Sequence, residues 1–158
     1  IVIIRHAQPE DPDKYTDDSL RPLTSKGKDI QQLMSQYLKK EGFKPELILT
    51  SPLLRARQTA EILSQIFQIP YKKDKDLGNQ FNGDSLIEKL PDPQKNQTVF
   101  LVGHAPTLAN FVHELVGKRV LPGEIPKSGA AVVKFSQKIE KHQGEFIKVY
   151  APDSCLKD

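Results

Sequence analysis

The sequence predicts an α/β fold, a three-layer sandwich in which a mainly parallel sheet lies between layers of helices. Runs of apolar β-forming residues, such as Ile1 to Ile4 and Val99 to Val102, are typical of strands covered on both faces. Segments with a helical apolar period separate these runs, and such alternation favours a parallel sheet. The length of 158 residues suits one domain spanning residues 1–158.

The first strand is expected near residues 1–5, and it ends in Arg5 and His6. Ligands of parallel sheets bind at the carboxyl ends of the strands, so a cation and a nucleophile in this position are candidates for a site. The pair could also end a strand by chance, because short motifs produce false matches.

A helix is expected near residues 24–41, with Thr24 as its N-cap. Arg21 precedes it and could either reach a phosphate from the loop or pair with Asp17 or Asp18; both interpretations stay open. The apolar face of this helix is expected to carry Ile30, Leu33, Met34, Tyr37 and Leu38.

A strand near residues 46–50 leads into a helix near residues 52–67. Ser51 is a candidate N-cap, and Pro52 suits the first helical position. Arg55 then lies one turn inside the helix, and its side chain tilts back toward the end of the preceding strand. Arg57 faces elsewhere and is expected in solvent.

A strand near residues 98–102 is followed by His104 and by a helix near residues 106–116. His104 therefore repeats the position of Arg5 and His6 at a strand end, and a helix N-terminus there suits an anion. His113 and His142 are expected to be exposed and without function. A short strand near 69–72, a helical turn near 85–90, and a hairpin of strands 130–135 and 146–150 complete the expected elements.

Four short motifs resemble those of the histidine phosphatase superfamily, which has the phosphoglycerate mutase-like fold. They occur in the family's order and at similar spacings, over about residues 1 to 135. Within the superfamily, the short chain and the run of residues 21–24 look most like the phosphohistidine phosphatases. The motifs are Arg5-His6-Ala7, Leu23-Thr24-x-x-Gly27, Ser51-Pro52-x-x-Arg55-Ala56-x-Gln58-Thr59 and Gly103-His104.

The resemblance implies that His6 is the nucleophile and that Arg5, Arg55 and His104 bind phosphate. A neutral imidazole can hold a phosphoryl group as phosphohistidine, which divides one difficult step into two. Nearby arginines favour the neutral imidazole and stabilise the charge on the transferring oxygens. This scheme needs no metal and no cofactor.

The chain departs from the family pattern at two points. Ala7 stands where the family has glycine, a mild change if the backbone there keeps a negative φ. Many relatives also supply a glutamate as general acid after the second helix, whereas residues 76–84 contain none. Asp18 and Asp84 are possible substitutes. A missing acid suits a histidine leaving group, because the imidazole of a P–N bond can leave already protonated.

The preferred prediction is a phosphohistidine phosphatase that acts on phosphotransfer proteins, such as a histidine phosphotransfer domain. A phosphatase for small phosphomonoesters and an inactive phosphate-binding module are the alternatives. The stretch of residues 70–97 is too short for an inserted cap, which predicts an open mouth suited to a protein substrate.

Composition excludes several other classes of function. The net charge of +3 is mild, and the cluster Lys72, Lys73 and Lys75 lacks the interleaved aromatic residues of a nucleic-acid surface, so it is interpreted as a solvated loop. The sequence contains no run of about 18 apolar residues, so it predicts no membrane-spanning helix. The single Cys155 excludes an intramolecular disulfide. A cytoplasmic protein is expected.

Overall fold

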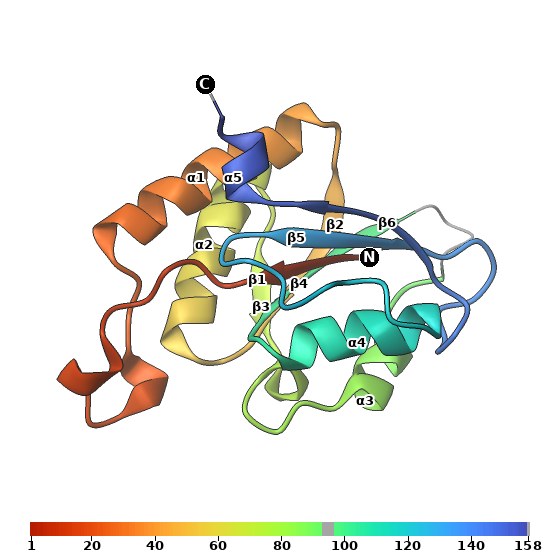
Figure 1. Cartoon of the computed structure of the whole chain (residues 1–158), viewed down its shortest axis with the longest axis horizontal. Coiled ribbons are helices and arrows are strands. Elements are labelled where there is room, and N and C mark those ends of the chain that lie inside the picture. The colour runs from red at the N-terminus through yellow and green to blue at the C-terminus, as the bar shows by residue number, and fades with distance from the viewer. Residues whose placement is uncertain (93–96, 158) are drawn as a thin grey trace.

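A mixed six-stranded sheet forms the centre of the computed structural model, which describes residues 1–92 and 97–157 (Figure 1). The strand order is β3-β2-β4-β1-β5-β6. Strands β1 to β4 are parallel to one another, whereas β5 runs antiparallel to both β1 and β6. The strands are β1 (Val2–Arg5), β2 (Pro45–Thr50), β3 (Tyr71–Lys73), β4 (Thr98–Gly103), β5 (Ala130–Lys134) and β6 (Glu145–Tyr150). The predicted mainly parallel sheet with an antiparallel edge is confirmed.

Helices cover both faces of this sheet. In Figure 1, α1 and α2 lie on one side and α3 and α4 on the other, while α5 packs near α1. No helix in the described ranges is long and apolar enough to span a bilayer. The helices are α1 (Ser25–Lys40), α2 (Leu54–Phe67), α3 (Gly83–Glu88), α4 (Thr107–Val116) and α5 (Pro152–Cys155). In the stretch of residues 70–97, residues 93–96 lie outside the described part, and Lys72 and Lys73 lie on β3 rather than in a loop.

The alternation of side chains along β1 divides the core into two layers. Val2 and Ile4 join the apolar cluster under α1 and α2, whereas Ile3 joins the cluster under α4. All three are buried, and burying one such side chain contributes about 1.5–3 kcal/mol. An apolar run without polar residues is therefore what a strand covered on both faces requires.

The predicted apolar face of α1 is wrong at Leu33, which is 51% exposed. Gln31 and Ser35 are buried instead, one helical turn apart. The Gln31 side chain donates to the Ser35 hydroxyl at 3.1 Å, and that hydroxyl donates to the Gln31 carbonyl oxygen at 2.7 Å. The Gln31 side-chain nitrogen and the Ser35 hydroxyl therefore have partners inside the helix, whereas Gln31 Oε1 has none among the described residues.

The carboxyl ends of β1, β2 and β4 meet at one edge of the sheet. Arg5 pairs with Gly103 in register, and Thr50 pairs with Val102. The backbone bonds continue one residue further, because the His6 N–H donates to the Gly103 carbonyl at 3.0 Å and the Ser51 N–H to the Val102 carbonyl at 2.9 Å. This register brings the residues that follow the three strands side by side.

Candidate active site

A hollow of about 580 Å³ lies at this edge of the sheet. It brings together the five residues that the sequence predicted: Arg5, His6, Arg21, Arg55 and His104. The other lining residues come mostly from the loop between β1 and α1. They are Gln8, Pro9, Glu10, Asp11, Pro12, Thr24, Ala105 and Lys127.

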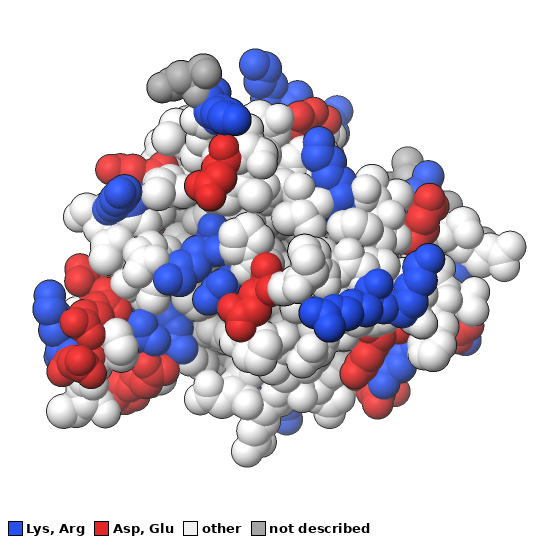
Figure 2. All heavy atoms as spheres, viewed as in Figure 1, with Lys and Arg blue, Asp and Glu red and all other residues white. Residues whose placement is uncertain are grey.

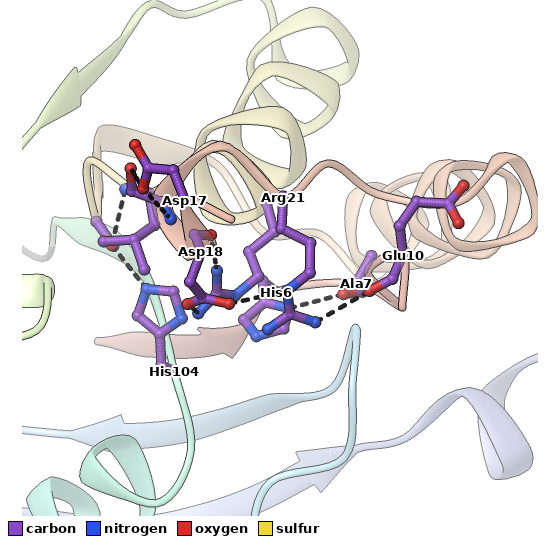
Figure 3. Close-up of polar contacts among 11 residues, drawn as sticks. His6, Ala7, Glu10, Asp17, Asp18, Arg21 and His104 are labelled. Atoms are coloured by element: carbon purple, nitrogen blue, oxygen red, sulfur yellow. Dashed lines mark hydrogen bonds and ion pairs between the residues drawn. The ribbon is translucent and has the colours of Figure 1, made fainter. Parts of the chain in front are cut away.

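His6 is buried with a defined tautomer (Figure 3). Its Nδ1 lies 2.7 Å from the Ala7 carbonyl oxygen, which can only accept, so Nδ1 carries the proton and Nε2 keeps a free lone pair. Burial lowers the pKa of His6 to about 3; the nearby positive charges act in the same direction, and the bond to Ala7 opposes them. The ring is therefore neutral at pH 7.

A short chain of hydrogen bonds fixes the peptide that holds His6. The Ala7 N–H donates to the Thr59 hydroxyl at 3.0 Å, and this hydroxyl donates to the Arg55 carbonyl at 2.8 Å. Ala7 is not among the residues with positive φ, so alanine fits the position that is glycine in the family. The peptide after His6 is thereby tied to α2 through Thr59 and Arg55.

Ser51 forms a hydrogen bond with His104 and is not the N-cap of α2. The Nε2 of His104 lies 2.7 Å from the Ser51 hydroxyl, which also accepts from the Leu53 N–H at 3.2 Å. The predicted N-cap is wrong: α2 begins at Leu54, with Leu53 as its N-cap, so Arg55 is the second residue of the helix. Burial lowers the pKa of His104 to about 4, and Arg55 adds to the effect.

Arg5 and Arg55 are each held by a carbonyl oxygen and a carboxylate. Arg5 Nη1 donates to the Ile125 carbonyl at 3.1 Å and lies 3.5 Å from the Glu124 carboxylate. Arg55 Nη1 donates to the Asp18 carbonyl at 3.0 Å, and Nη2 donates to the Asp18 carboxylate at 3.1 Å. Both guanidinium groups are thus oriented by the protein itself.

Arg21 pairs with Asp18 at 3.0 Å, as one of its two interpretations predicted. It also lines the hollow, and its contact with a phosphate stays a prediction. The guanidinium group donates to the Glu10 carbonyl at 3.1 Å (Figure 3). Desolvation raises the pKa of Asp18, but Arg55 and Arg21 outweigh it and hold that pKa below its usual value. A carboxyl group that is ionised at pH 7 is a poor general acid. Asp84, the other candidate, pairs with Lys141 and does not line the hollow.

Three buried nitrogens around the hollow have no hydrogen-bond partner among the described residues. They are Arg5 Nε, Arg55 Nε and His104 Nδ1. Ser51 can donate its hydroxyl hydrogen to His104 Nε2, which leaves the remaining ring proton on Nδ1. All three nitrogens are then donors, and a buried donor without a partner is costly. An oxyanion with several acceptor oxygens suits such a set.

The remaining motif residues position the loop between β1 and α1. Gln58 accepts the Leu23 N–H at 2.8 Å, and Thr24 caps α1 by accepting the Gly27 N–H at 2.9 Å, as predicted. At Gly27 a Cβ atom would lie 2.5 Å from the Gln8 carbonyl oxygen, so the loop requires glycine there. The sequence pattern contained Gln58 and Thr59 but did not indicate what they contact.

Charge is unevenly distributed around the mouth of the hollow. Figure 2 shows acidic side chains gathered at the end of the molecule where the loop of residues 9–21 lies. This acidic loop comprises Glu10, Asp11, Asp13, Asp17 and Asp18. Lys127 lies on the wall of the hollow and donates to Gln8 at 2.8 Å. Sequence analysis did not single out Lys127 or Glu124, because neither belongs to a motif.

The other histidines lie outside the hollow. His142 is exposed, as predicted, whereas His113 is half-buried and its Nε2 accepts the Leu121 N–H at 3.2 Å. The prediction of an exposed His113 is therefore wrong, because its ring holds the loop after α4. Arg57 is half-buried rather than in solvent. Within residues 1–92 and 97–157, no group of three or more His, Cys, Asp or Glu residues is arranged to hold a metal ion.

The chain is similar to known histidine phosphatases. The model of the histidine phosphatase superfamily (branch 1) matches residues 1–85. The phosphohistidine phosphatase SixA of Escherichia coli is 33% identical over 113 residues, covering 69% of this chain and 67% of that protein. An uncharacterized protein of Picosynechococcus is 37% identical over 123 residues, covering 73% of this chain and 72% of that protein.

Solved structures show the same fold. The protein histidine phosphatase SixA complexed with tungstate superposes with a TM-score of 0.83 at 27% identity, covering 99% of this chain and 98% of that one. A mycobacterial glucosyl-3-phosphoglycerate phosphatase shares the fold at a TM-score of 0.68 and 16% identity, covering 92% and 95% of the two chains. The predicted phosphoglycerate mutase-like fold and the resemblance to phosphohistidine phosphatases are confirmed.

Proposed function

Since this chain belongs to the histidine phosphatase superfamily and is a phosphatase, we propose that it dephosphorylates histidine-phosphorylated proteins through a phosphohistidine intermediate on His6. One observation carries the proposal. The free Nε2 of neutral His6 shares a hollow with two oriented arginines and His104, each of which has a buried nitrogen without a partner among the described residues. That arrangement combines a nucleophile with donors for an oxyanion.

In the first step, His6 Nε2 attacks the phosphorus atom of the substrate. A bond forms from Nε2 to phosphorus, and the P–N bond of the substrate histidine breaks with its electron pair going to that ring nitrogen. If the other nitrogen of the substrate ring is protonated, the leaving group is a neutral imidazole. Arg5, Arg55 and His104 donate to the phosphoryl oxygens as their charge is redistributed.

In the second step, water attacks the phosphoryl group on His6. The new bond joins the water oxygen to phosphorus, the Nε2–P bond breaks with its electrons returning to Nε2, and the proton from water passes to phosphate or solvent. Phosphorylated His6 is an imidazolium whose Nδ1–H donates to the Ala7 carbonyl, so the ring leaves as a neutral imidazole. Neither step requires a general acid.

A rapid-quench experiment with a phosphorylated histidine phosphotransfer domain tests the proposal. We expect acid-labile, alkali-stable phosphate on the enzyme together with released inorganic phosphate, and we expect His6→Ala to abolish both. His142→Asn is the matched control, since it alters an exposed histidine outside the hollow. Continued hydrolysis by His6→Ala, with the fold intact, would refute the nucleophile assignment. Binding of tungstate without any turnover would favour the inactive phosphate-binding module.

The leaving group distinguishes the proposal from a small-molecule phosphomonoesterase. An alkoxide needs a proton in order to leave, and the carboxyl group of Asp18 is held ionised by two arginines. We therefore expect a higher kcat/KM with a phosphohistidine protein than with an alkyl phosphate ester. An equal or higher value for the ester would favour the phosphomonoesterase.

A further inference from the structure

A second hollow of about 260 Å³ lies beside the active site, and we call it the flanking groove. It is bounded by α1, by residues 126–128 and by the start of α5. Gln8 and Lys127 line both the flanking groove and the catalytic hollow, and Lys127 Nζ donates to Gln8 Oε1 at 2.8 Å. Both side chains are exposed, so together they form a low, movable boundary between the two hollows.

The middle of the flanking groove is apolar. Ile30, Pro126, Ala151 and Pro152 line it, and all four are only half-buried. The sequence placed Ile30 on the core face of α1, yet its side chain is only half-buried. A half-buried apolar surface next to a reaction site is suited to contact with an apolar side chain from outside.

Two exposed residues of opposite charge line the flanking groove. Lys127 also lines the catalytic hollow, whereas Asp153 lines only the groove. Within the part of the chain that the structure describes, neither residue forms an ion pair. Both are exposed and therefore accessible to charges of a partner.

The wall of the groove is fixed to the catalytic strand. Arg5 Nη1 donates to the Ile125 carbonyl at 3.1 Å, and the Ser128 N–H donates to the Arg5 carbonyl at 3.1 Å. The Gly129 N–H closes the turn by donating to the Pro126 carbonyl at 2.8 Å. The groove is thus formed before any partner binds, which limits the ordering that binding requires.

We infer that the flanking groove docks one stretch of polypeptide next to the phosphohistidine of a substrate protein, either the residues that precede it or those that follow it. The favoured segment has an acidic residue next to the phosphohistidine, then an apolar residue, then a basic residue. The acidic residue binds Lys127, the apolar residue packs on Ile30, and the basic residue binds Asp153. This inference rests on the proposed function, because it assumes a phosphohistidine in the catalytic hollow.

Two features of the mouth favour this order of charges. The acidic loop lies on the wall of the hollow through Glu10 and Asp11, so an acidic residue beside the phosphohistidine is repelled there and attracted to Lys127. A basic residue farther along the segment lies away from the arginines of the hollow and next to the carboxylate of Asp153. A polypeptide advances about 3.3 Å per residue when extended, so neighbouring residues reach successive parts of a groove.

Two peptides of equal net charge test the inference, each built around a stable phosphoryltriazole mimic of phosphohistidine. In the first, Glu, Leu and Lys follow the mimic in that order on both sides; in the second, Lys and Glu are exchanged. The symmetric design makes the result independent of chain direction. Fluorescence anisotropy should show the first peptide binding about tenfold more tightly, because its charges form rim ion pairs with Lys127 and Asp153 where those of the second peptide are repelled.

Reversing the charge of Asp153 tests whether the flanking groove causes the preference between the two peptides. Asp153→Lys should reduce the preference between the two peptides to about twofold or less. In this variant a lysine repels the Lys of the first peptide and attracts the Glu of the second. Asp29→Lys makes the same change in net charge at an exposed position of α1 that does not line the groove, and it should preserve the preference. Replacing Leu by Ser in the first peptide should weaken its binding.

Failure of the inference is distinct from failure of the proposed function. Equal binding of both peptides to the unmodified protein, with hydrolysis of a phosphohistidine protein intact, overturns the docking groove alone. The same holds if Asp29→Lys and Asp153→Lys lower the preference equally. If the unmodified protein hydrolyses phenyl phosphate but no phosphohistidine protein, the proposed function fails, and the docking inference fails with it.

Discussion

At the scale of single residues, Asp18 has the most unusual position, because its carboxylate contacts two arginines of the proposed phosphate site. It lies 3.1 Å from Arg55 Nη2 and 3.0 Å from Arg21 Nε, and its side chain is 58% exposed. An exposed ion pair of this kind contributes only about 0–1 kcal/mol. Asp18 therefore competes with a bound oxyanion for the arginines more than it stabilises the fold.

Asp18→Asn should strengthen the binding of tungstate about twofold to fivefold, a range that corresponds to one exposed ion pair. The Asp18 carbonyl oxygen still holds Arg55 Nη1 in this variant, so Arg55 keeps its orientation. Isothermal titration calorimetry with tungstate provides the measurement. Asp17→Asn is the control, since it removes the same charge from the same loop without contacting Arg55. Weaker binding by Asp18→Asn would mean that the carboxylate is needed to orient Arg55.

Single-residue reasoning from the sequence identified Arg5, His6 and His104 because each follows a recognisable buried strand. It did not identify the partners that define their chemistry. The contact of Ser51 with His104 and that of Asp18 with Arg55 join segments that lie 53 and 37 residues apart. No local spacing rule relates such positions, so these contacts depend on the register of the sheet and the path of the loop.

At the scale of elements, α2 links the proposed phosphate site to His6, the proposed nucleophile. Arg55 and Thr59 are one turn apart, so one points into the hollow while the other bonds to the peptide after His6. The sequence predicted this helix but placed its start two residues too early. Ser51 looks like an N-cap from the sequence, but its hydroxyl accepts from the Leu53 N–H and bonds to His104.

Thr59→Val should lower kcat by about tenfold or more, because small displacements of a reacting group are costly to rate. The substitution keeps the shape of the side chain but leaves the buried Ala7 N–H without an acceptor, which costs about 1–3 kcal/mol of folding stability. Single-turnover kinetics below the melting temperature should show slower phosphorylation of His6, with tungstate affinity nearly unchanged.

Thr59→Ser is the matched rescue variant, since it retains the hydroxyl that accepts from Ala7 and donates to Arg55. It should keep kcat within about threefold of the unmodified protein, consistent with a restored hydrogen bond. If Thr59→Val loses stability but keeps its full rate of phosphorylation, Thr59 supports only the fold and does not position His6.

At the scale of the whole molecule, the fold buries His6 and half-buries His104 at one edge of the central sheet. The fold class could be predicted because β1 and β4 are apolar on both faces, as Val2, Ile3 and Ile4 illustrate. Which side of α1 faces the core could not be predicted, because the buried pair of Gln31 and Ser35 has the same polarity as surface residues. The flanking groove could not be predicted either, because its lining residues come from four segments that lie far apart in the sequence.

The two histidines make the stability of the whole molecule depend on pH. Their folded-state pKa values are about 3 for His6 and about 4 for His104, whereas an unfolded histidine titrates near about 6.5. Above pH 6.5 both states are neutral, and the pair imposes no pH dependence. Below pH 6.5 the unfolded chain binds protons that the folded one does not, so the free energy of unfolding falls as pH falls toward 4.

Urea denaturation between pH 7.5 and 4 measures this effect. Each histidine should add a slope of at most about 1.4 kcal/mol per pH unit between its two pKa values, so the double variant His6→Gln/His104→Gln should lose stability less steeply than the unmodified protein. His142→Asn, which alters an exposed histidine, should follow the unmodified curve. Parallel curves for the double variant and the unmodified protein would show that His6 and His104 accept protons in the folded state. The nucleophile would then be charged near pH 6, and its attack on phosphorus would require prior loss of a proton.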